Sequence, residues 1–257
     1  MLGPGVLLRH NRGRLTFESK PSQEASLMQP QSAPYPVRVR GELEAVSRWR
    51  WLIKWLLAIP HYLVLLVLAG GYLVVTVIAF FAILFTGRYP RPLFDFTVGV
   101  MRWRWRVAFY AISALGTDRY PPFSLRPKPE YPADLEVDYP ERLHRGRVLV
   151  KWWLLALPHY LVLALLYNGG WRFFNDHGDH WDLHFVLPLA PLLLLIAMIG
   201  LLFTGRYPEG LYDLMIGINR WALRVRVYAS LMRDEYPPFR LDMGPREPDF
   251  PGTGKTG

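Results

Sequence analysis

The first long apolar stretch of the chain runs between two arginine-rich segments. No residue from Trp55 to Gly87 carries a fixed charge, and only His61 titrates near neutral pH. As a single helix this stretch would be about 50 Å long, which exceeds the roughly 30 Å hydrocarbon core of a membrane. The pattern therefore predicts a tight hairpin of two short spans, a re-entrant pair of helices or one very tilted helix.

Three motifs of the chain occur twice. The Pro-His-Tyr motif at 60–62 returns 98 residues later, and the Thr-Gly-Arg-Tyr-Pro motif at 86–90 returns 118 residues later. The Tyr-Pro-Pro-Phe motif at 120–123 returns at 236–239. A duplicated unit with apolar runs beside arginine-rich ends predicts a membrane protein that is built from two like halves.

The second half carries an insert, because its two motifs lie 20 residues further apart than those of the first half. The insert falls around Asn168 to Leu183 and holds charged residues that would not lie inside lipid. Since it must be a loop, the second half should contain two membrane spans. We expect the first half to match it, with a break at Gly70-Gly71. The four predicted spans are 51–69, 71–86, 148–168 and 183–203.

The charges that flank these spans predict their orientation. Arginine and lysine are frequent before the first span and after the second span of a hairpin. The 168–182 loop, between the third and fourth spans, holds one arginine and three aspartates. The positive-inside rule then places both termini and the central linker in the cytoplasm and the loop outside. With two spans each, the halves would be parallel repeats about an axis along the membrane normal. Gly87 and Gly205 are predicted to be left-handed caps that end the second span of each half.

Each predicted hairpin is followed by a segment that is too charged to span a membrane. Apolar residues in 93–115 recur at 4-3-4-3 spacing, and the second half keeps this spacing. The pattern predicts an amphipathic helix in the headgroup plane, capped at Asp95 and Asp213, that favours anionic lipid. A groove of a partner protein would suit the same face, and nucleic acid is not expected. The candidate lipid or partner contacts are Arg88, Arg102, Trp103, Arg104, Trp105, Arg106, Arg206, Arg220, Trp221 and Arg224.

A short alternating segment precedes each predicted hairpin. The segment 37–40 is basic at alternate positions, and the segment 135–138 is acidic at alternate positions. Two such strands could pair across a pseudo-twofold axis with opposite charges facing each other, for example Arg38 and Glu136. The alternative is a pair of unrelated extended linkers.

Two histidines are the first candidates for chemistry. His61 and His159 each lie about ten residues into a predicted span, near mid-bilayer, and each directly follows a proline. An intramembrane histidine is a candidate functional residue, so the pair could ligate haem, relay protons or line a substrate path. The alternative is that each imidazole bonds a backbone carbonyl that the proline has left without its partner.

The acidic insert supplies a second candidate. His177, His180 and His184 would share one face of a helix, which is workable ligand geometry for zinc or copper. Gly178 and the aspartates disfavour a helix there, so a solvated loop is the alternative. The chain has no cysteine, and no Ser-His-Asp arrangement or paired-carboxylate cleft can be placed. We therefore do not expect an enzyme.

The repeated motifs resemble a known family. In the first half they are Lys54–Tyr62, Leu84–Pro90, Leu93–Phe96 with Gly99, Arg102–Val107 and Asp118–Phe123. The chain resembles the bacterial membrane-protein family called domain of unknown function 4389, over about 35–125 and again over 135–241. The second half departs from the pattern, because Ala222 and Leu223 replace an Arg-Trp pair and its Lys-Trp pair is displaced by one residue. The resemblance implies a bacterial inner-membrane location, but it does not indicate any particular activity.

These observations predict a fold class and a division of the chain. We expect an all-α membrane protein with four transmembrane helices in two parallel hairpin repeats, each followed by an amphipathic interfacial helix and preceded by a short extended segment. The repeats are 35–130 and 131–241, between disordered tails at 1–34 and 242–257. The expected function is a non-enzymatic integral membrane scaffold or accessory subunit that binds lipids, in particular anionic ones, or a larger complex. The alternatives are a small transporter or channel and a haem- or metal-binding redox subunit.

Overall fold

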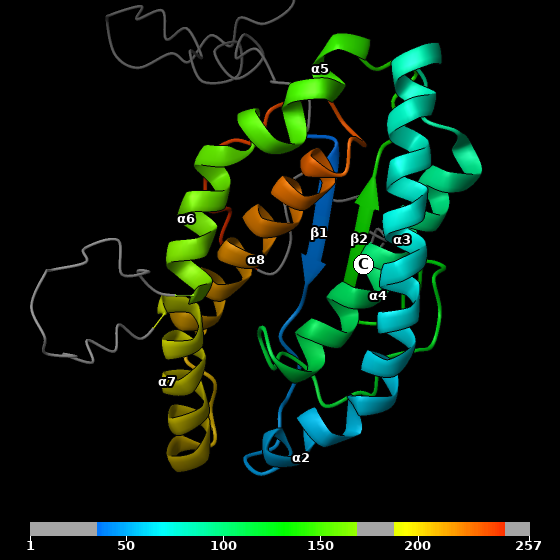
Figure 1. The fold of residues 1–257 in the computed structure, drawn as a ribbon. Coiled ribbons are helices and arrows are strands. Elements are labelled where there is room, and N and C mark those ends of the chain that lie inside the picture. The colour runs from blue at the N-terminus through cyan, green and yellow to red at the C-terminus, as the bar shows by residue number, and fades with distance from the viewer. Residues whose placement is uncertain (1–34, 169–187, 245–257) are drawn as a thin grey trace, which may run out of the picture. The chain divides into compact units, whose positions relative to one another are not determined.

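The structure is a computed structural model that describes residues 35–168 and 188–244. The described part is mostly helical (Figure 1). Its elements are β1 (Val37–Gly41), α2 (Trp51–Leu57), α3 (Ile59–Thr86), α4 (Arg91–Ala111), β2 (Ala133–Val137), α5 (Arg145–Val150), the π-helical turn η1 (Lys151–Leu155), α6 (Leu157–Asn168), α7 (Leu189–Thr204) and α8 (Glu209–Ala229). The predicted tail at 1–34, most of the predicted loop at 168–182 and the last residues from 245 lie outside the described residues.

The apolar stretch of the first half forms one continuous helix. Because α3 runs unbroken through Gly70-Gly71, the predicted hairpin of spans 51–69 and 71–86 is wrong. A glycine inside a helix costs only about 1 kcal/mol relative to alanine, which is too little to break a helix that is otherwise strongly apolar. The 28 residues of α3 give a length of about 42 Å. Of the three sequence alternatives, a single long helix is the one observed.

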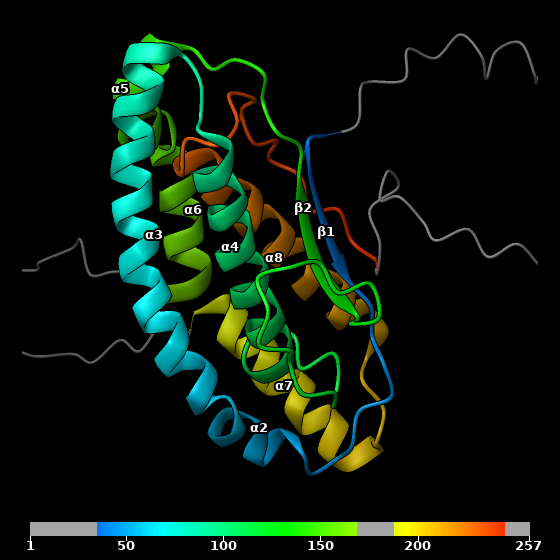
Figure 2. The same cartoon turned by 90° about the vertical axis from the view of Figure 1, so that its right-hand side faces the viewer.

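The second half also lacks the predicted hairpin. By the repeated motifs, α6 and α7 together correspond to α3. Figures 1 and 2 both place α7 beyond the end of α6, not folded back alongside it. The two helices therefore do not form an antiparallel hairpin. As predicted, the long helices of both halves end in left-handed glycine caps, at Gly87 with φ 72° and at Gly205 with φ 69°.

A π-helical turn explains the displaced Lys-Trp pair. The second half has one residue more between Lys151 and Pro158 than the first half has between Lys54 and Pro60. The turn η1 absorbs this extra residue within the helix. As a result the lysine and the Pro-His-Tyr motif keep equivalent places in both halves.

The two strands pair as the charge pattern predicted. β1 and β2 form an antiparallel pair in which Arg38 faces Glu136 and Val39 faces Leu135. The Nε of Arg38 lies 3.6 Å from the Glu136 carboxylate, so the opposite charges meet. The hypothesis of cross-repeat strand pairing is confirmed.

Each strand packs on a helix of the other half. Strand β2, which begins the second half, packs on α4 of the first, and β1 packs on α8 of the second. The Nε of Arg102 donates to the Leu135 carbonyl at 3.0 Å, and the Nε of Arg220 donates to the Val39 carbonyl at 3.1 Å. Since Val39 and Leu135 face each other, a pseudo-twofold axis passes through this pair.

The axis relates two halves that run in opposite directions. In both views α3 ascends, whereas α6 and α7 descend (Figures 1 and 2). The prediction of parallel repeats is therefore wrong, because the long helices of each half run in a single direction and do not fold back as a hairpin. In Figure 2, α4 and α8 lie between the sheet and the long helices. Trp105, Phe109 and Ile216 are buried in this middle layer and pack in the same core as Val39 and Leu135.

Candidate functional site

The helices α4 and α8 are buried, although the sequence predicted that they lie in the headgroup plane. Trp103, Trp105, Trp221 and the arginines at 102, 106, 220 and 224 are each at most 8% exposed. These seven predicted lipid contacts therefore face the protein interior. Asp95 and Asp213 are not caps, since α4 and α8 begin four residues earlier, after prolines.

A carboxylate from the sheet explains why the arginines of α4 are buried. Asp134 Oδ1 lies 2.8 Å from Arg102 Nε and 3.3 Å from Arg106 Nη2. Arg106 also donates to the carbonyls of Ser124 and Arg126. Burial lowers the pKa of Arg106, and the Asp134 carboxylate opposes this shift. These contacts link α4 to β2, and they pair both guanidinium groups with a carboxylate inside the protein.

The second half builds a related contact with a different acid. Arg224 Nη2 lies 2.5 Å from the Asp242 carboxylate, and Arg220 donates to the Asp242 carbonyl. Both guanidinium groups are fully buried. The sequence spacing of these arginines predicted a helix but gave no sign of their partners, which come from the sheet and from the C-terminal segment.

His61 lies in the first turn of α3 and is fully buried. Trp103 Nε1 donates a hydrogen bond of 3.1 Å to His61 Nδ1, so His61 is neutral and carries its proton on Nε2. The Phe123 ring stacks on the imidazole at 3.9 Å, and the Tyr120 ring lies at 4.8 Å. The predicted mid-span position is wrong, because the helix begins only two residues before His61. The alternative, a bond from the imidazole to the carbonyl that Pro60 frees at Leu56, is also wrong, because Nδ1 accepts from Trp103 and Nε2 has no hydrogen-bond partner among the described residues.

The second half repeats this cluster around His159. Phe239 stacks on the buried imidazole at 4.1 Å, with Tyr236 at 4.8 Å and Trp221 at 5.6 Å. Neither imidazole nitrogen has a hydrogen-bond partner among the described residues. The two histidines are therefore enclosed by the repeated Tyr-Pro-Pro-Phe motif and a tryptophan of their own half. This packing joins the start of each long helix to the middle layer.

A buried lysine and aspartate form another repeated cluster, which the sequence interpretation missed. Lys54 Nζ lies 2.8 Å from Asp118, and Lys151 Nζ lies 3.0 Å from Asp234. Burial lowers the pKa of Lys54. Burial would raise the pKa of Asp118, but hydrogen bonds from Lys54 and Ser47 hold it below its ordinary value. The signal was present in the sequence, because both residues recur in equivalent positions of the two halves.

The long helices expose an almost continuous apolar surface, which we call the apolar face. Only 6% of the most apolar part of α3 is buried, so α3 is not a core helix. Two helices, Ile59–Thr86 and Arg145–Asn168, are long and apolar enough to cross a membrane by length and composition, and α7 is a shorter apolar helix. Strongly exposed members of the face are Leu66, Val67, Phe85, Leu161 and Phe203.

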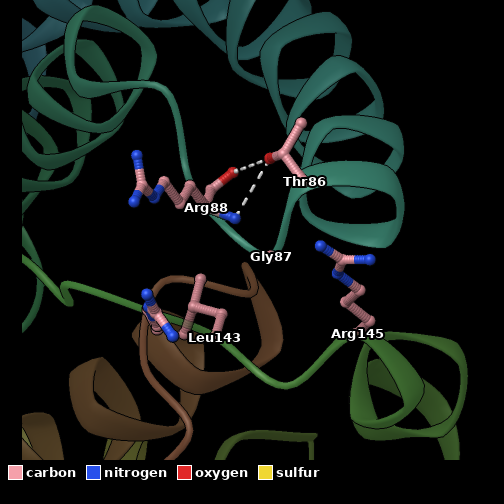
Figure 3. Close-up of a pocket in the computed structure, with 6 residues that line it drawn as sticks. Thr86, Gly87, Arg88, Leu143 and Arg145 are labelled. Carbon is pink, nitrogen blue, oxygen red and sulfur yellow. Dashed lines mark hydrogen bonds between the residues drawn. The ribbon is translucent and has the colours of Figure 1, made fainter.

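Three of the predicted lipid contacts remain at the surface. Arg104 is exposed on α4, and Arg88 and Arg206 are exposed directly after the glycine caps of α3 and α7. Arg88 lines a pocket of about 390 Å³ together with Arg142 and Arg145 (Figure 3). The histidines 177, 180 and 184 lie outside the described residues. Within 35–168 and 188–244, no group of three or more His, Asp or Glu side chains could hold a metal ion.

The geometry defines a two-copy helical protein with two candidate membrane-spanning helices. The family model described as domain of unknown function (DUF4389) matches residues 48–124 and 183–240, which together are more than half of the chain. The chain therefore belongs to this family and carries two copies of the domain, as the repeated motifs indicated. Searches of curated proteins and of solved structures found no match.

Proposed function

We propose that this chain is a non-enzymatic membrane scaffold that embeds its apolar face in one leaflet of the membrane. The exposed apolar surface of α3, α6 and α7 is the observation that carries the proposal. An uncovered surface of large aliphatic and aromatic side chains needs an apolar environment. Membrane lipid supplies that environment, and the location expected from the family resemblance is the bacterial inner membrane.

The sheet favours an orientation in the membrane plane. Figures 1 and 2 place β1 and β2 at the level of α3 along its length, on the other side of α4 and α8. If α3 crossed the bilayer, the sheet and its charged side chains, such as Arg38 and Glu136, would lie beside the hydrocarbon core, where charges are costly. With α3 in the membrane plane, the sheet faces water.

The charges at both ends of α3 fit the same orientation. The exposed residues Arg48 and Arg50 precede the helix, and Arg88 and Arg91 follow it. A transmembrane helix that obeys the positive-inside rule carries its excess of cations at one end. A helix that lies in the interface can place cations of both ends among anionic headgroups. The sheet would then lie on the cytoplasmic side of the membrane.

The buried polar groups support a structural role and not catalysis. Lys54 bonds Asp118, Arg102 and Arg106 share Asp134, and His61 accepts from Trp103.

These buried lysine, arginine and histidine side chains are thus all bonded to other residues inside the protein. The alternative functions, a histidine-lined path or a haem subunit, need an accessible imidazole. His61 and His159 are fully buried under phenylalanine rings, so the scaffold is the better supported function.

The absence of cysteine makes the orientation directly testable. Single-cysteine variants Trp49→Cys, before α2, and Asp95→Cys, in the second turn of α4, place thiols at exposed sites near the two ends of α3. An impermeant maleimide should label both from the cytoplasmic side of sealed vesicles. Leu66→Cys, in the middle of the apolar face, should react only after detergent is added. Glu136→Cys on the sheet is the control and should be labelled together with the two end sites.

Two outcomes would overturn the proposal. Labelling of the two end sites from opposite sides of the membrane would show that α3 crosses the bilayer. Recovery of the protein in the supernatant after an alkaline carbonate wash would show that the apolar face is not embedded in lipid.

A further inference from the structure

We propose that the pocket at the C-terminal end of α3 binds a phosphate group, carried by an anionic phospholipid or by a soluble phosphate. The site deepens the proposed scaffold function and rests on it for the lipid source. The pocket, of about 390 Å³, is lined by Thr86, Gly87, Arg88, Arg142, Leu143 and Arg145 (Figure 3). Three of its six lining residues are arginines, and none is acidic.

The three arginines form no ion pair within the described part of the chain. Their guanidinium groups make no ion pair or side-chain hydrogen bond with any residue of 35–168 or 188–244. A neighbouring pocket shares Arg142 and is lined by Glu141, Asp234 and Glu235. Asp234 pairs with Lys151 and Glu235 pairs with Arg233, so these two carboxylates already have partners. Glu141 lines only the neighbouring pocket and forms no ion pair with the three arginines. The positive charge of the pocket is thus available to an external anion.

The backbone holds this cationic group together across the two halves. The left-handed cap at Gly87 turns the chain at the end of α3, and the Gly87 carbonyl accepts from the Leu143 N–H at 2.9 Å. A side chain at Gly87 would meet Arg145 Nε at 3.3 Å, so the approach of Arg145 depends on glycine. Figure 3 shows Arg88 and Arg145 on opposite sides of Gly87. Two segments far apart in the sequence therefore build one site.

The electrostatic balance at the pocket favours an anion. The C-terminus of a helix is equivalent to about half a negative charge, which three guanidinium groups outweigh. Arginine presents paired N–H donors that match the oxygens of phosphate. The exposed side chains of Phe81 and Phe85 continue the apolar face up to the pocket. A phospholipid could therefore place its phosphate at the arginines and its acyl chains along α3.

The pseudo-twofold axis supplies an internal comparison. At the end of α7, Gly205 and Arg206 repeat the cap, and Arg48 approaches Gly205 as Arg145 approaches Gly87. The residue three positions before Arg48 is Ala45, whereas Arg142 stands three positions before Arg145. The second end therefore has two arginines where the first has three. We expect the first end to bind phosphate more strongly.

Vesicle flotation of the full chain tests the site. Vesicles of phosphatidylcholine alone report membrane embedding, because the choline cation compensates the phosphate charge. Vesicles that also contain phosphatidylglycerol report the anionic site as a gain in bound protein. Arg142→Gln should reduce this gain about fivefold, the effect of one arginine near an anionic surface. Arg126→Gln removes an equal charge from an exposed position beside the sheet and is the matched control.

A competition arm separates the two sources of phosphate. If inorganic phosphate or glycerol phosphate binds the detergent-purified protein in calorimetry and Arg142→Gln weakens that binding, the ligand is a soluble phosphate. If neither soluble probe binds but the phosphatidylglycerol gain depends on Arg142, the ligand is a lipid. The variant Ala45→Arg, which adds a third arginine at the other end, should raise the gain.

The results also separate this site from the scaffold proposal. Equal losses in Arg142→Gln and Arg126→Gln would overturn the site, since they would reflect net charge alone. The same conclusion follows if phosphatidylglycerol, inorganic phosphate and glycerol phosphate all fail to bind. Failure to float with phosphatidylcholine alone would overturn membrane embedding, whereas binding of a soluble phosphate would still support the site.

Discussion

The buried cluster around Asp134 gives the sharpest test of the fold. The Asp134→Asn variant keeps the size of the side chain and removes its charge. Arg102 and Arg106 would then share the interior without a carboxylate, although their side chains are only 9% and 0% exposed. Because Asp134 lies on β2 and the arginines lie on α4, the change acts directly on the contact between the sheet and the middle layer.

The expected cost follows from the burial of these charges. Removing one partner of a buried ion pair costs about 3–5 kcal/mol, because the remaining charge stays in the interior unpaired. Here one carboxylate serves two guanidinium groups that also repel each other, so we expect the upper part of this range. A typical domain has a total stability of about 5–15 kcal/mol. Asp134→Asn should therefore remove a third or more of it.

Guanidinium chloride unfolding in detergent, followed by tryptophan fluorescence, measures the loss. Asp138→Asn is the control, because Asp138 pairs with Arg38 but is 47% exposed, and an exposed pair contributes about 0–1 kcal/mol. A triple variant with Asp134→Leu, Arg102→Met and Arg106→Met should recover stability, since no charge is then buried in this cluster. A free energy of unfolding for Asp134→Asn within about 1 kcal/mol of the unchanged protein would refute the reasoning.

Three further predictions concern other parts of the fold. Gly70→Ala should raise stability by about 0.5–1 kcal/mol in the same unfolding assay, because an added Cβ meets nothing within 4 Å and α3 is continuous; a loss would indicate a turn at this position. His61→Phe should cost about 1–3 kcal/mol more than His159→Phe, because only His61 accepts a hydrogen bond from a buried tryptophan, Trp103; equal costs in unfolding would contradict that hydrogen bond. The Asp118 pKa lies below its ordinary 3.8 in the folded protein, so the stability that Asp118 contributes is present above pH 3.8 and lost as the pH falls through the folded pKa. Unfolding midpoints measured across this range should show an acid-side decline that Asp118→Asn reduces, and an unchanged decline would argue against the ion pair.

Local patterns in the sequence predicted the local structure well. The 4-3-4-3 spacing in 93–115 predicted α4, and the glycines after the apolar runs predicted the left-handed caps at Gly87 and Gly205. Opposite charges on two alternating segments predicted the pairing of β1 with β2. Each of these features depends on residues that are close in sequence or on a simple match of charge.

The prediction of two hairpins was wrong because the loop inferred for the second half was assumed to exist in the first half as well. The charged insert at 168–182 requires a loop in the second half, but the first half has only Gly70-Gly71 at that place. Two glycines do not end a helix when no polar residue competes for the backbone. The prediction also assumed that a long apolar helix must run across the bilayer.

The buried arginines were misplaced for a different reason. Alternating arginine and tryptophan is typical of a membrane interface, and nothing near Arg102 or Arg106 in the sequence offers a counter-charge. Asp134 becomes their partner only because β2 crosses α4. A contact between segments about thirty residues apart has no local signal. The residues Lys54 and Asp118 are even further apart in the sequence, but the recurrence of their pair as Lys151–Asp234 could have revealed it.

The comparison of the two halves separates what the fold needs from what it does not. Both halves keep the histidine under a stacked phenylalanine, the buried lysine-aspartate pair and the left-handed cap, which fasten the long helices to the middle layer. A fold built on a pseudo-twofold axis has to meet these requirements at both ends. The differences carry no such requirement: Arg142 has Ala45 as its counterpart, and only the second half has the 168–182 insert. A function that is specific to this chain is therefore to be sought at these unequal positions, and the arginine pocket is the one that lies within the described residues.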